Sequence, residues 1–417
     1  METGRLHEFY PLLYGNGYDE NEMDERYLCL EKKHKDLFNN NAPMIFSAAG
    51  RTEIGGNHTD HNQGKVIGGT INLDTIAAVS ERDDMRIILA SEGFPTADID
   101  ISNLDIKEEE KNSTEALLRG IARAFRDRGF EIRGWQANTS TKVLKGSGLS
   151  SSAAIEVLCA EIFNNLYAGD TLSPIELAEI GQFAENTYFG KPSGLLDQLC
   201  CACGGITGID FKDKSNPKVK KIPADFSDFG YVMIITDTKG NHANLTHEYA
   251  AVPSEMKQIA EFYGKNSLRD IDFRTFMNDI PEIRKSIKND RALLRAYHFF
   301  TENIRVDMML EALENNDFDD FLNLVKESGD SSFRFLQNAY QSSHAEEQGL
   351  SLGIALSESI MQNSGAVRVH GGGFAGTIQA YVPEEDADVY IEEMERVFGK
   401  GSAMRIEIRK NPVCRIL

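Results

Sequence analysis

The sequence lacks the features of a secreted or membrane-spanning protein. Its 417 residues include only six cysteines, which are too few and too clustered for a disulfide framework. The first ten residues contain no basic segment followed by an apolar core, as a signal peptide would. No apolar run approaches the roughly 18 residues that a membrane span needs. These absences predict a cytosolic protein without a membrane partner.

Basic residues are also scarce. The chain has 44 Lys and Arg against 65 Asp and Glu, a formal net charge of −21. Such a surface repels phosphodiester backbones, so we expect no nucleic-acid partner. A small anion could bind only in a locally positive or amide-lined pocket. The length exceeds the roughly 250–300 residues that one core usually supports, which predicts two domains.

Three familiar motifs are missing or incomplete. None of the Gly-Lys pairs is followed by Ser or Thr, as a P-loop requires. Residues 371–376 fit GxGxxG, but TIQAYV follows and predicts a strand where a dinucleotide fold needs a helix. We interpret the triple glycine as a tight turn. Cys200 and Cys203 form a CxxC with no second pair at zinc spacing, so we interpret them as small buried residues.

The periodicity of the remaining chain predicts a mixed α+β protein. An acidic N-terminal arm precedes a helix, and strands follow. A helix is expected over 113–128, a strand near 135–144, a Gly/Ser turn, and a helix from about 150. Residues 254–362 have mostly helical spacing, and 366–382 have strand character. A second α+β domain is therefore expected to begin near 215–230.

The turn between that strand and helix, Gly146 to Ala154, is the most informative segment. Glycines let backbone amides approach a phosphate, serines add hydroxyl donors, and the helix turns its positive end toward the anion. Serine hydroxyls also bind Mg²⁺. The turn therefore predicts a phosphate site, and an ordinary N-capped turn is the alternative.

Two further segments carry candidate binding or catalytic groups. Residues 50–64 read GRTEIGGNHTDHNQG, whose Asp, Asn and His side chains can bridge neighbouring sugar hydroxyls. A solvated loop or a metal site are the alternatives there. Asp197 lies among apolar residues, where an unpaired carboxylate is costly, so a partner such as an Arg is expected. Glu185 lies on a helical run and is interpreted as a solvated position.

Together these segments resemble the GHMP kinase superfamily and, within it, the galactokinases. The family motifs GRxNxIGEHxDYN, GxGLSSSA, GIMDQ and GGGFGG correspond to residues 50–62, 146–153, 194–198 and 371–376. They stand in the family's order, and AENTYFGKPSGLLDQ and the pair Glu248-Tyr249 match as well. The resemblance covers most of the chain.

The resemblance implies a two-domain α+β fold with the active site in the cleft between the domains. A ribosomal-protein-S5-like domain would span 1–215, and a ferredoxin-like α+β domain 216–417. ATP and Mg²⁺ would be the cofactors and a sugar the substrate. A monomer stays one option for the oligomeric state.

The resemblance also implies roles for individual residues. Arg51 would stabilise charge at the reacting hydroxyl and Asp197 would act as its base. Ser152 and Glu185 would bind Mg²⁺. The nucleotide would contact Ser91, Gly146, Ser147, Gly148, Leu149, Ser150, Ser151 and Ser152. The sugar would contact Asn57, His58, Thr59, Asp60 and Tyr249.

Five positions depart from the family motifs. Glu53 replaces Asn, Asn57 replaces Glu, His61 replaces Tyr, Ser193 replaces Cys and His370 replaces Thr. These changes bear on the sugar more than on the reaction.

The predicted function is phosphorylation of a monosaccharide at its anomeric 1-hydroxyl, and galactose is the substrate that the resemblance favours. The same chemistry on galacturonate, arabinose or N-acetylgalactosamine stays open, because Asn57 in place of an acid would relieve repulsion of a uronate. A silent sugar and ATP sensor is the third reading. An intact Ser-rich loop and Asp197 argue against it.

Overall fold

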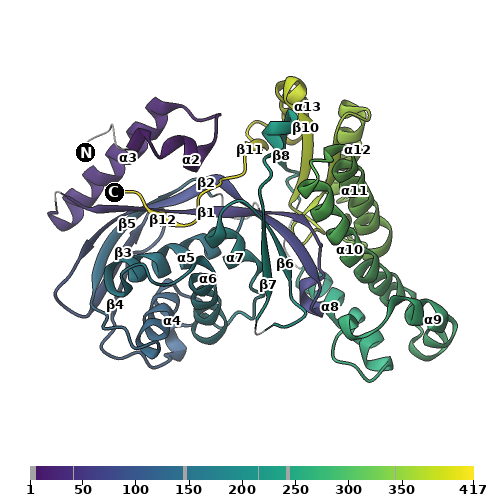
Figure 1. Ribbon diagram of the computed structural model, residues 1–417, viewed down its shortest axis with the longest axis horizontal. Helices are drawn as coiled ribbons and strands as arrows, with labels where there is room; N and C mark the ends of the chain where they lie inside the picture. The colour runs from purple at the N-terminus through teal and green to yellow at the C-terminus, as the bar shows by residue number, and fades with distance from the viewer. Residues whose placement is uncertain (1–5, 41, 144–147, 215, 241–244, 343) are drawn as a thin grey trace.

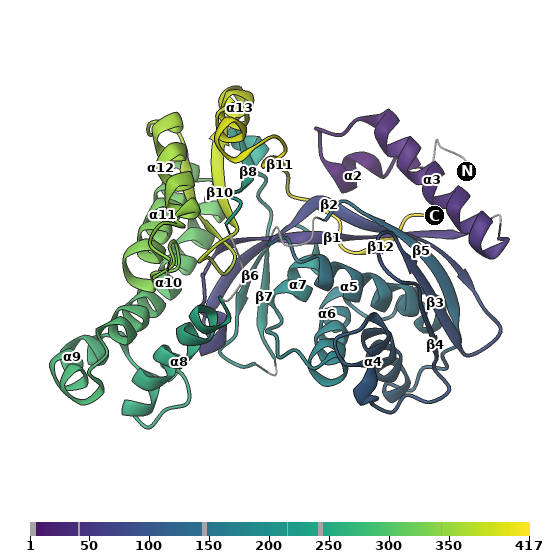
Figure 2. The same cartoon turned by 180° about the vertical axis from the view of Figure 1, so that it is seen from behind.

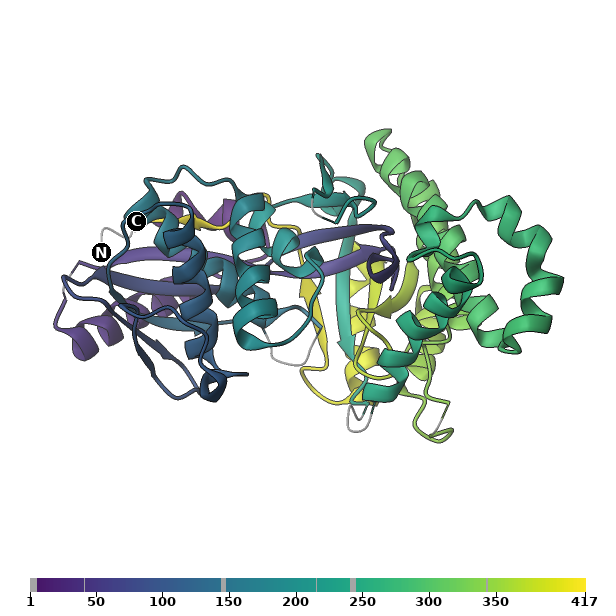
Figure 3. The same cartoon turned by 90° about the horizontal axis from the view of Figure 1, so that it is seen from below.

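The computed structural model arranges the chain as two β-sheets with helices packed against each (Figure 1). It describes residues 6–40, 42–143, 148–214, 216–240, 245–342 and 344–417. Seen from below, the helices of the two sheets lie at opposite ends of the molecule (Figure 3).

The first sheet has eight strands in the described part of the chain. Six follow the order β12-β1-β2-β5-β3-β4, while β6 pairs with β2 and β7 with β6. Only the pairing of β3 with β5 is parallel. The strands are β1 (Met44–Gly55), β2 (Lys65–Glu81), β3 (Arg86–Ser91), β4 (Ala97–Asp100), β5 (Trp135–Thr141), β6 (Ile206–Asp210), β7 (Lys218–Ile222) and β12 (Cys414–Arg415).

Helices cover both faces of this sheet, so its long strands β1 and β2 are buried almost throughout. One face is covered by α4 (Thr114–Asp127), α5 (Ser151–Phe163), α6 (Pro174–Phe183) and α7 (Leu196–Cys203). The N-terminal helices α2 (Tyr10–Tyr14) and α3 (Glu20–Phe38) lie on the other face (Figures 1 and 2). Asp19 caps α3, so the acidic stretch of the arm begins that helix.

The second sheet is antiparallel with the order β11-β8-β10-β9. Numbered along the chain, the strands of this sheet lie side by side in the order 4-1-3-2. Helix α12 lies in the connection from the first strand to the second, and α13 in the connection from the third to the fourth. This is the expected ferredoxin-like arrangement. The strands are β8 (Tyr231–Asp237), β9 (Ala366–His370), β10 (Thr377–Pro383) and β11 (Ala403–Ile406). The helices are α8 (Thr246–Phe262), α9 (Phe273–Ile287), α10 (Asp290–Glu314), α11 (Phe318–Ser331), α12 (Gly349–Met361) and α13 (Ala387–Phe398).

The sequence predictions for these elements largely hold. The helix expected over 113–128 is α4, the helix after the Gly/Ser turn is α5, and 254–362 is mostly helical. The triple glycine forms the tight turn between β9 and β10, and no helix follows it. Cys200 and Cys203 are free and buried in α7, as expected.

The first sheet takes strands from both sides of residue 215. β7 pairs with β6, and β12 pairs with β1 through Phe46–Arg415 and Ser47–Cys414. Arg409, which is 1% exposed, donates to the Ser47 hydroxyl at 2.6 Å just before β12. The domain division at 215 stays a prediction.

Candidate active site

Arg51 and Asp197 meet where α7 packs against β1 of the first sheet. Arg51 lies on β1 and Asp197 in the first turn of α7. The guanidinium Nε donates to Asp197 Oδ1 at 2.8 Å and Nη2 lies 2.7 Å from the same oxygen. Arg51 is therefore the partner that the apolar setting of Asp197 required. The Arg51 side chain is 9% exposed but that of Asp197 is 38% exposed, so a ligand can reach the carboxylate.

The surroundings of Asp197 keep it ionised. Burial alone would raise the pKa of this carboxyl, but the charge of Arg51 and a hydrogen bond from Ser150 outweigh burial and lower the pKa below 3.8. At neutral pH Asp197 is consequently a carboxylate, which accepts protons and does not donate them.

The described part of the Ser-rich loop is tied to this pair. Ser150 Oγ donates to Asp197 Oδ2 at 2.5 Å, and Arg51 donates to the carbonyl of Gly148. Ser150 has φ 58° and ψ 56°, a left-handed conformation that is strained for serine. Its side chain faces Asp197 and does not cap α5, whose first-turn amides stay available for an anion. Leu149 is buried, whereas Gly146 and Ser147 lie outside the described residues.

Glu185 lies beside the same helices but is not solvated. The residue is 3% exposed, so the expectation of a solvated helical position is wrong. Glu185 lies four positions after Gly181 and eight after Leu177, which are buried in α6, so helical spacing places it on the same buried face. Its carboxylate contacts Lys191 Nζ at 2.8 Å and Gln198 Nε2 at 3.0 Å, and also the Ser193 hydroxyl. Ser152, the other expected Mg²⁺ ligand, is exposed in the first turn of α5.

The segment after β1 meets the glycine turn of the second sheet. His58 Nε2 donates to the Gly372 carbonyl at 2.9 Å, and Tyr249 donates to the Gly373 carbonyl at 2.9 Å. His58 has φ 57°, a left-handed backbone. Burial and then the neighbouring His61 lower the pKa of His58 to about 4, so its ring is neutral at pH 7. Two expected sugar residues, one from the turn after β1 and one from α8, therefore converge on the glycine turn of the second sheet.

The comparisons with known proteins agree with this geometry. The model of the GHMP kinases N terminal domain matches residues 115–205, and the galactokinase galactose-binding signature matches residues 32–81. The galactokinase of Glaesserella parasuis is 31% identical over 351 residues, covering 82% of this chain and 85% of the relative. The chain belongs to the galactokinase family. The galactokinase of Streptomyces coelicolor is 28% identical over 376 residues, and this alignment covers 88% of this chain and 92% of that galactokinase.

Solved structures confirm the fold predicted for this galactokinase-family protein. Lactococcus lactis galactokinase complexed with galactose has a TM-score of 0.79 at 21% identity, covering 94% of this chain and 100% of that one. Mevalonate kinase of Methanococcus jannaschii has a TM-score of 0.63 at 16% identity, covering 88% and 99%. The α+β GHMP kinase fold is therefore correct.

Four of the remaining expected site residues have partners within the protein. Thr59 is fully buried, and its hydroxyl donates to the carbonyls of Gly56 at 2.9 Å and Lys65 at 2.7 Å. Asp60 begins a short 3-10 turn, with a side chain that is 19% exposed. Ser91 ends β3, where its hydroxyl accepts from Thr139 at 3.0 Å. Asn57 is 1% exposed, and its side-chain amide donates to the Gly371 carbonyl at 2.7 Å.

Some residues that support the site were not predicted as functional. His370, seen in the sequence only as a departure from the family, accepts from the Glu53 amide at 3.4 Å and bonds Thr52 and Thr377. The Glu53 backbone amide can only donate a hydrogen bond, so Nε2 is the unprotonated, accepting nitrogen of the His370 ring. Burial and then the charge of Arg51 hold the pKa of His370 well below 6.5. Lys191 and Gln198 also contact Glu185, and both lie within the matching stretch AENTYFGKPSGLLDQ, which was their signal in the sequence.

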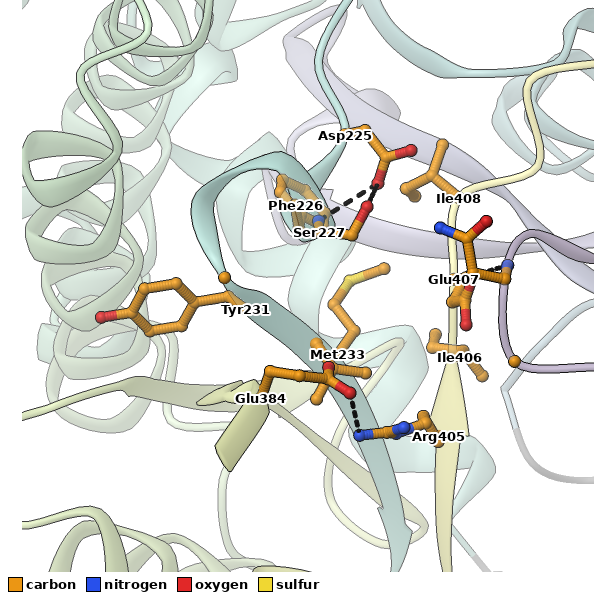
Figure 4. A pocket seen from close by; sticks show the side chains of 14 residues that line it. Asp225, Phe226, Ser227, Tyr231, Met233, Glu384, Arg405, Ile406, Glu407 and Ile408 are labelled. Carbon is orange, nitrogen blue, oxygen red and sulfur yellow. Dashed lines mark hydrogen bonds and ion pairs between the residues drawn. The ribbon is translucent and has the colours of Figure 1, made fainter. Parts of the chain in front are cut away.

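A pocket of about 210 Å³ lies elsewhere, between the N-terminal arm and the second sheet (Figure 4). Asp225 and Arg405 are among the described residues that line it, and none of the predicted site residues is. Within the described ranges, no helix is long and apolar enough to cross a membrane.

Proposed function

We propose that this protein transfers the γ-phosphoryl group of ATP to the anomeric 1-hydroxyl of a monosaccharide, with galactose as the first substrate. The observation that carries the proposal is the Ser150–Asp197–Arg51 contact, which joins the Ser-rich loop to an ionised carboxylate. Kinases of the GHMP superfamily use ATP as phosphate donor. The two curated relatives described above are named as galactokinases, which supports galactose.

The reaction follows from these groups. The sugar 1-oxygen bonds to the γ-phosphorus as the bond from that phosphorus to the β,γ-bridging oxygen breaks, and ADP leaves with the electron pair. Asp197 accepts the hydroxyl proton during this step. Arg51 is placed to offset the charge that develops on the transferred group, and the amides at the start of α5 to hold the phosphates.

The residues present fit a magnesium ion. Glu156 Oε1 and Gln198 Oε1 are buried beside Glu185 and have no hydrogen-bond partner among the described atoms, which leaves oxygen atoms free for a hard cation. No group of three or more His, Cys, Asp or Glu that could hold a metal is found in the described ranges. Ser152 and Glu185 would hold Mg²⁺ together with phosphate oxygens. Bound there, the ion neutralises phosphate charge.

Asn57, His58, Thr59, Asp60 and Tyr249 are proposed to form the sugar site, and Ser91 to contact the nucleotide. In this proposal Asn57 and Thr59 support the site, because their polar groups are bonded within the protein. His58 and Tyr249 are the best supported, since both reach the turn at Gly372 and Gly373.

Release of ADP tests the proposal directly. Purified protein is mixed with ATP and Mg²⁺ and offered galactose, galacturonate, arabinose, N-acetylgalactosamine and glucose. We expect ADP with galactose above all others, and a product phosphorylated at C1 by phosphorus NMR. Absence of sugar-dependent ADP with every aldose would remove the kinase assignment and favour a silent sensor.

A further inference from the structure

The two departures at positions 53 and 57 are in contact with each other. Asn57 Nδ2 donates to Glu53 Oε1 at 2.8 Å. The family motif has an amide at the first position and a carboxylate at the second, and this chain has the reverse. One carboxylate and one amide are thus kept in the same place, with the same total charge.

Asn57 has little capacity left for a ligand. The same Nδ2 donates to the Gly371 carbonyl at 2.7 Å, and Oδ1 accepts from Asn338 Nδ2 at 2.7 Å. Both amide hydrogens are used within the protein, and the residue is 1% exposed. Asn57 therefore holds Glu53 and the glycine turn together.

Glu53 keeps one oxygen for other contacts. Oε1 accepts from Asn57 and lies 3.4 Å from Arg368 Nη2. Oε2 has no hydrogen-bond partner among the described residues, and Glu53 is 8% exposed. The carboxylate balances Arg368, which is itself fully buried. Among the described residues, Arg368 therefore has a carboxylate partner and does not offer a uronate an unpaired cation.

Glu53 also lies near the groups proposed to meet the sugar. Its carboxyl is close enough to Arg51 and Asp60 for their charges to act on it. Through Asn57 it is linked to Gly371, next to the Gly372 and Gly373 carbonyls that bind His58 and Tyr249.

We propose that Glu53, oriented by Asn57, makes this site select a neutral sugar over a sugar acid. The free carboxylate oxygen accepts a hydrogen bond from a hydroxyl of a neutral sugar, whereas a uronate would bring a second negative charge against it. The inference rests on the proposed function, and it reverses the expectation that Asn57 relieves repulsion of galacturonate.

The test compares galactose with galacturonate in the wild type and in Glu53→Gln. This substitution keeps the shape and a hydrogen bond to Asn57 but removes the charge that balances Arg368. We expect the wild type to favour galactose in kcat/KM by roughly 100-fold or more, since like charges cost several kcal/mol. In Glu53→Gln that ratio should fall by at least about 10-fold, in part through a gain on galacturonate. An unchanged ratio, or equal use of both sugars by the wild type, would overturn the proposal.

Binding of each sugar, measured by calorimetry without nucleotide, separates this inference from the proposed function. If galactose binds and galacturonate does not, while no sugar yields ADP, the kinase assignment fails and the selectivity stands. If galacturonate is phosphorylated as well as galactose, the kinase stands and the selectivity fails.

A second variant covers the case in which Glu53→Gln does not fold. The double variant Glu53→Asn, Asn57→Glu puts the carboxylate at 57 and the amide at 53, and we expect it to prefer galactose. A folded double variant without that preference contradicts the proposal. The control is Glu384→Gln, the same chemical change at an exposed ion pair with Arg405 in the pocket of Figure 4, which should leave the ratio unchanged.

Discussion

The two ends of the site are built differently. At the reacting end, Arg51, Asp197 and Ser150 match the family motifs and contact each other directly within the first half of the chain. At the far end, Glu53 and Asn57 are exchanged, and their partners Arg368, Gly371 and Asn338 come from the second half. We therefore propose that one half of the chain supplies the reacting groups, whereas the choice of sugar depends on contacts between the two halves.

The largest effect is expected from the reacting end. Asp197→Asn removes the proton acceptor but keeps the side-chain size, and kcat should fall about 10³-fold, since a positioned base contributes roughly 10²–10⁴-fold. Sugar-dependent ADP release measures kcat, and calorimetry with ATP should show unchanged nucleotide binding. The matched control is Asp225→Asn, which removes a Lys410-paired carboxylate in the remote pocket. Near-wild-type turnover in Asp197→Asn would take this residue out of its proposed role.

The next effect concerns stability at the far end. Asn57→Glu sets a second carboxylate against Glu53 in a buried place, so we expect the free energy of unfolding to fall by about 3 kcal/mol. Adding Glu53→Asn restores one carboxylate and one amide and should recover most of that loss. Urea denaturation of the wild type, both single variants and the double variant gives the coupling. Additive losses would mean that the pair does not act as a unit.

A smaller effect is expected at the glycine turn. Gly373 has φ +76°, and an added Cβ would lie 2.2 Å from the Asn338 carbonyl oxygen. Gly93 has φ +78° with nothing within 4 Å, so Gly93→Ala has similar backbone strain without the clash. We expect the free energy of unfolding of Gly373→Ala to be about 2 kcal/mol lower than that of Gly93→Ala. Gly373→Ala should also have a higher KM for the sugar. Equal losses from both substitutions would show that the turn can move aside.

The smallest effect is a difference in pH response between the two ends. Burial, opposed in part by Arg368 and Asn57, raises the pKa of Glu53 above 4.5, whereas that of Asp197 lies below 3.8. As pH falls, Glu53 gains its proton first, so KM for galactose should rise before kcat falls. This order is tested by measuring kcat and KM for galactose from pH 8 down to the lowest pH at which the protein stays folded. The rise in KM should be absent from Glu53→Gln.

The reacting end could be predicted from the sequence because its motifs are contiguous. The Ser-rich loop and the stretch around Asp197 each carry their own signal, and an unpaired carboxylate among apolar residues already required a cation. Glu185 was predicted to be solvated from its residue type, because a lone Glu on a helix is usually exposed. The spacing indicates the opposite, since Leu177 and Gly181 lie eight and four positions earlier on the same buried face.

The contacts at the far end could not be predicted from the sequence, for a different reason. In the sequence, Glu53 and Asn57 are two separate departures from the family motif, and Asn57 alone suggests the loss of a carboxylate. Only the folded chain shows that the two side chains touch and that Asn338 and Gly371, some 280 to 315 positions away, complete their hydrogen bonds. A pattern within one short segment cannot indicate such partners.

The pairing of β12 with β1 bears on how the protein is made. β1 is among the first strands to leave the ribosome, but its edge partner β12 follows all four strands of the second sheet in the chain. Arg409, which reaches Ser47 on β1, is made equally late. During synthesis the β1 edge is therefore exposed for most of translation, and an open strand edge can pair with other chains. The N-terminal half is thus expected to aggregate when it is expressed alone.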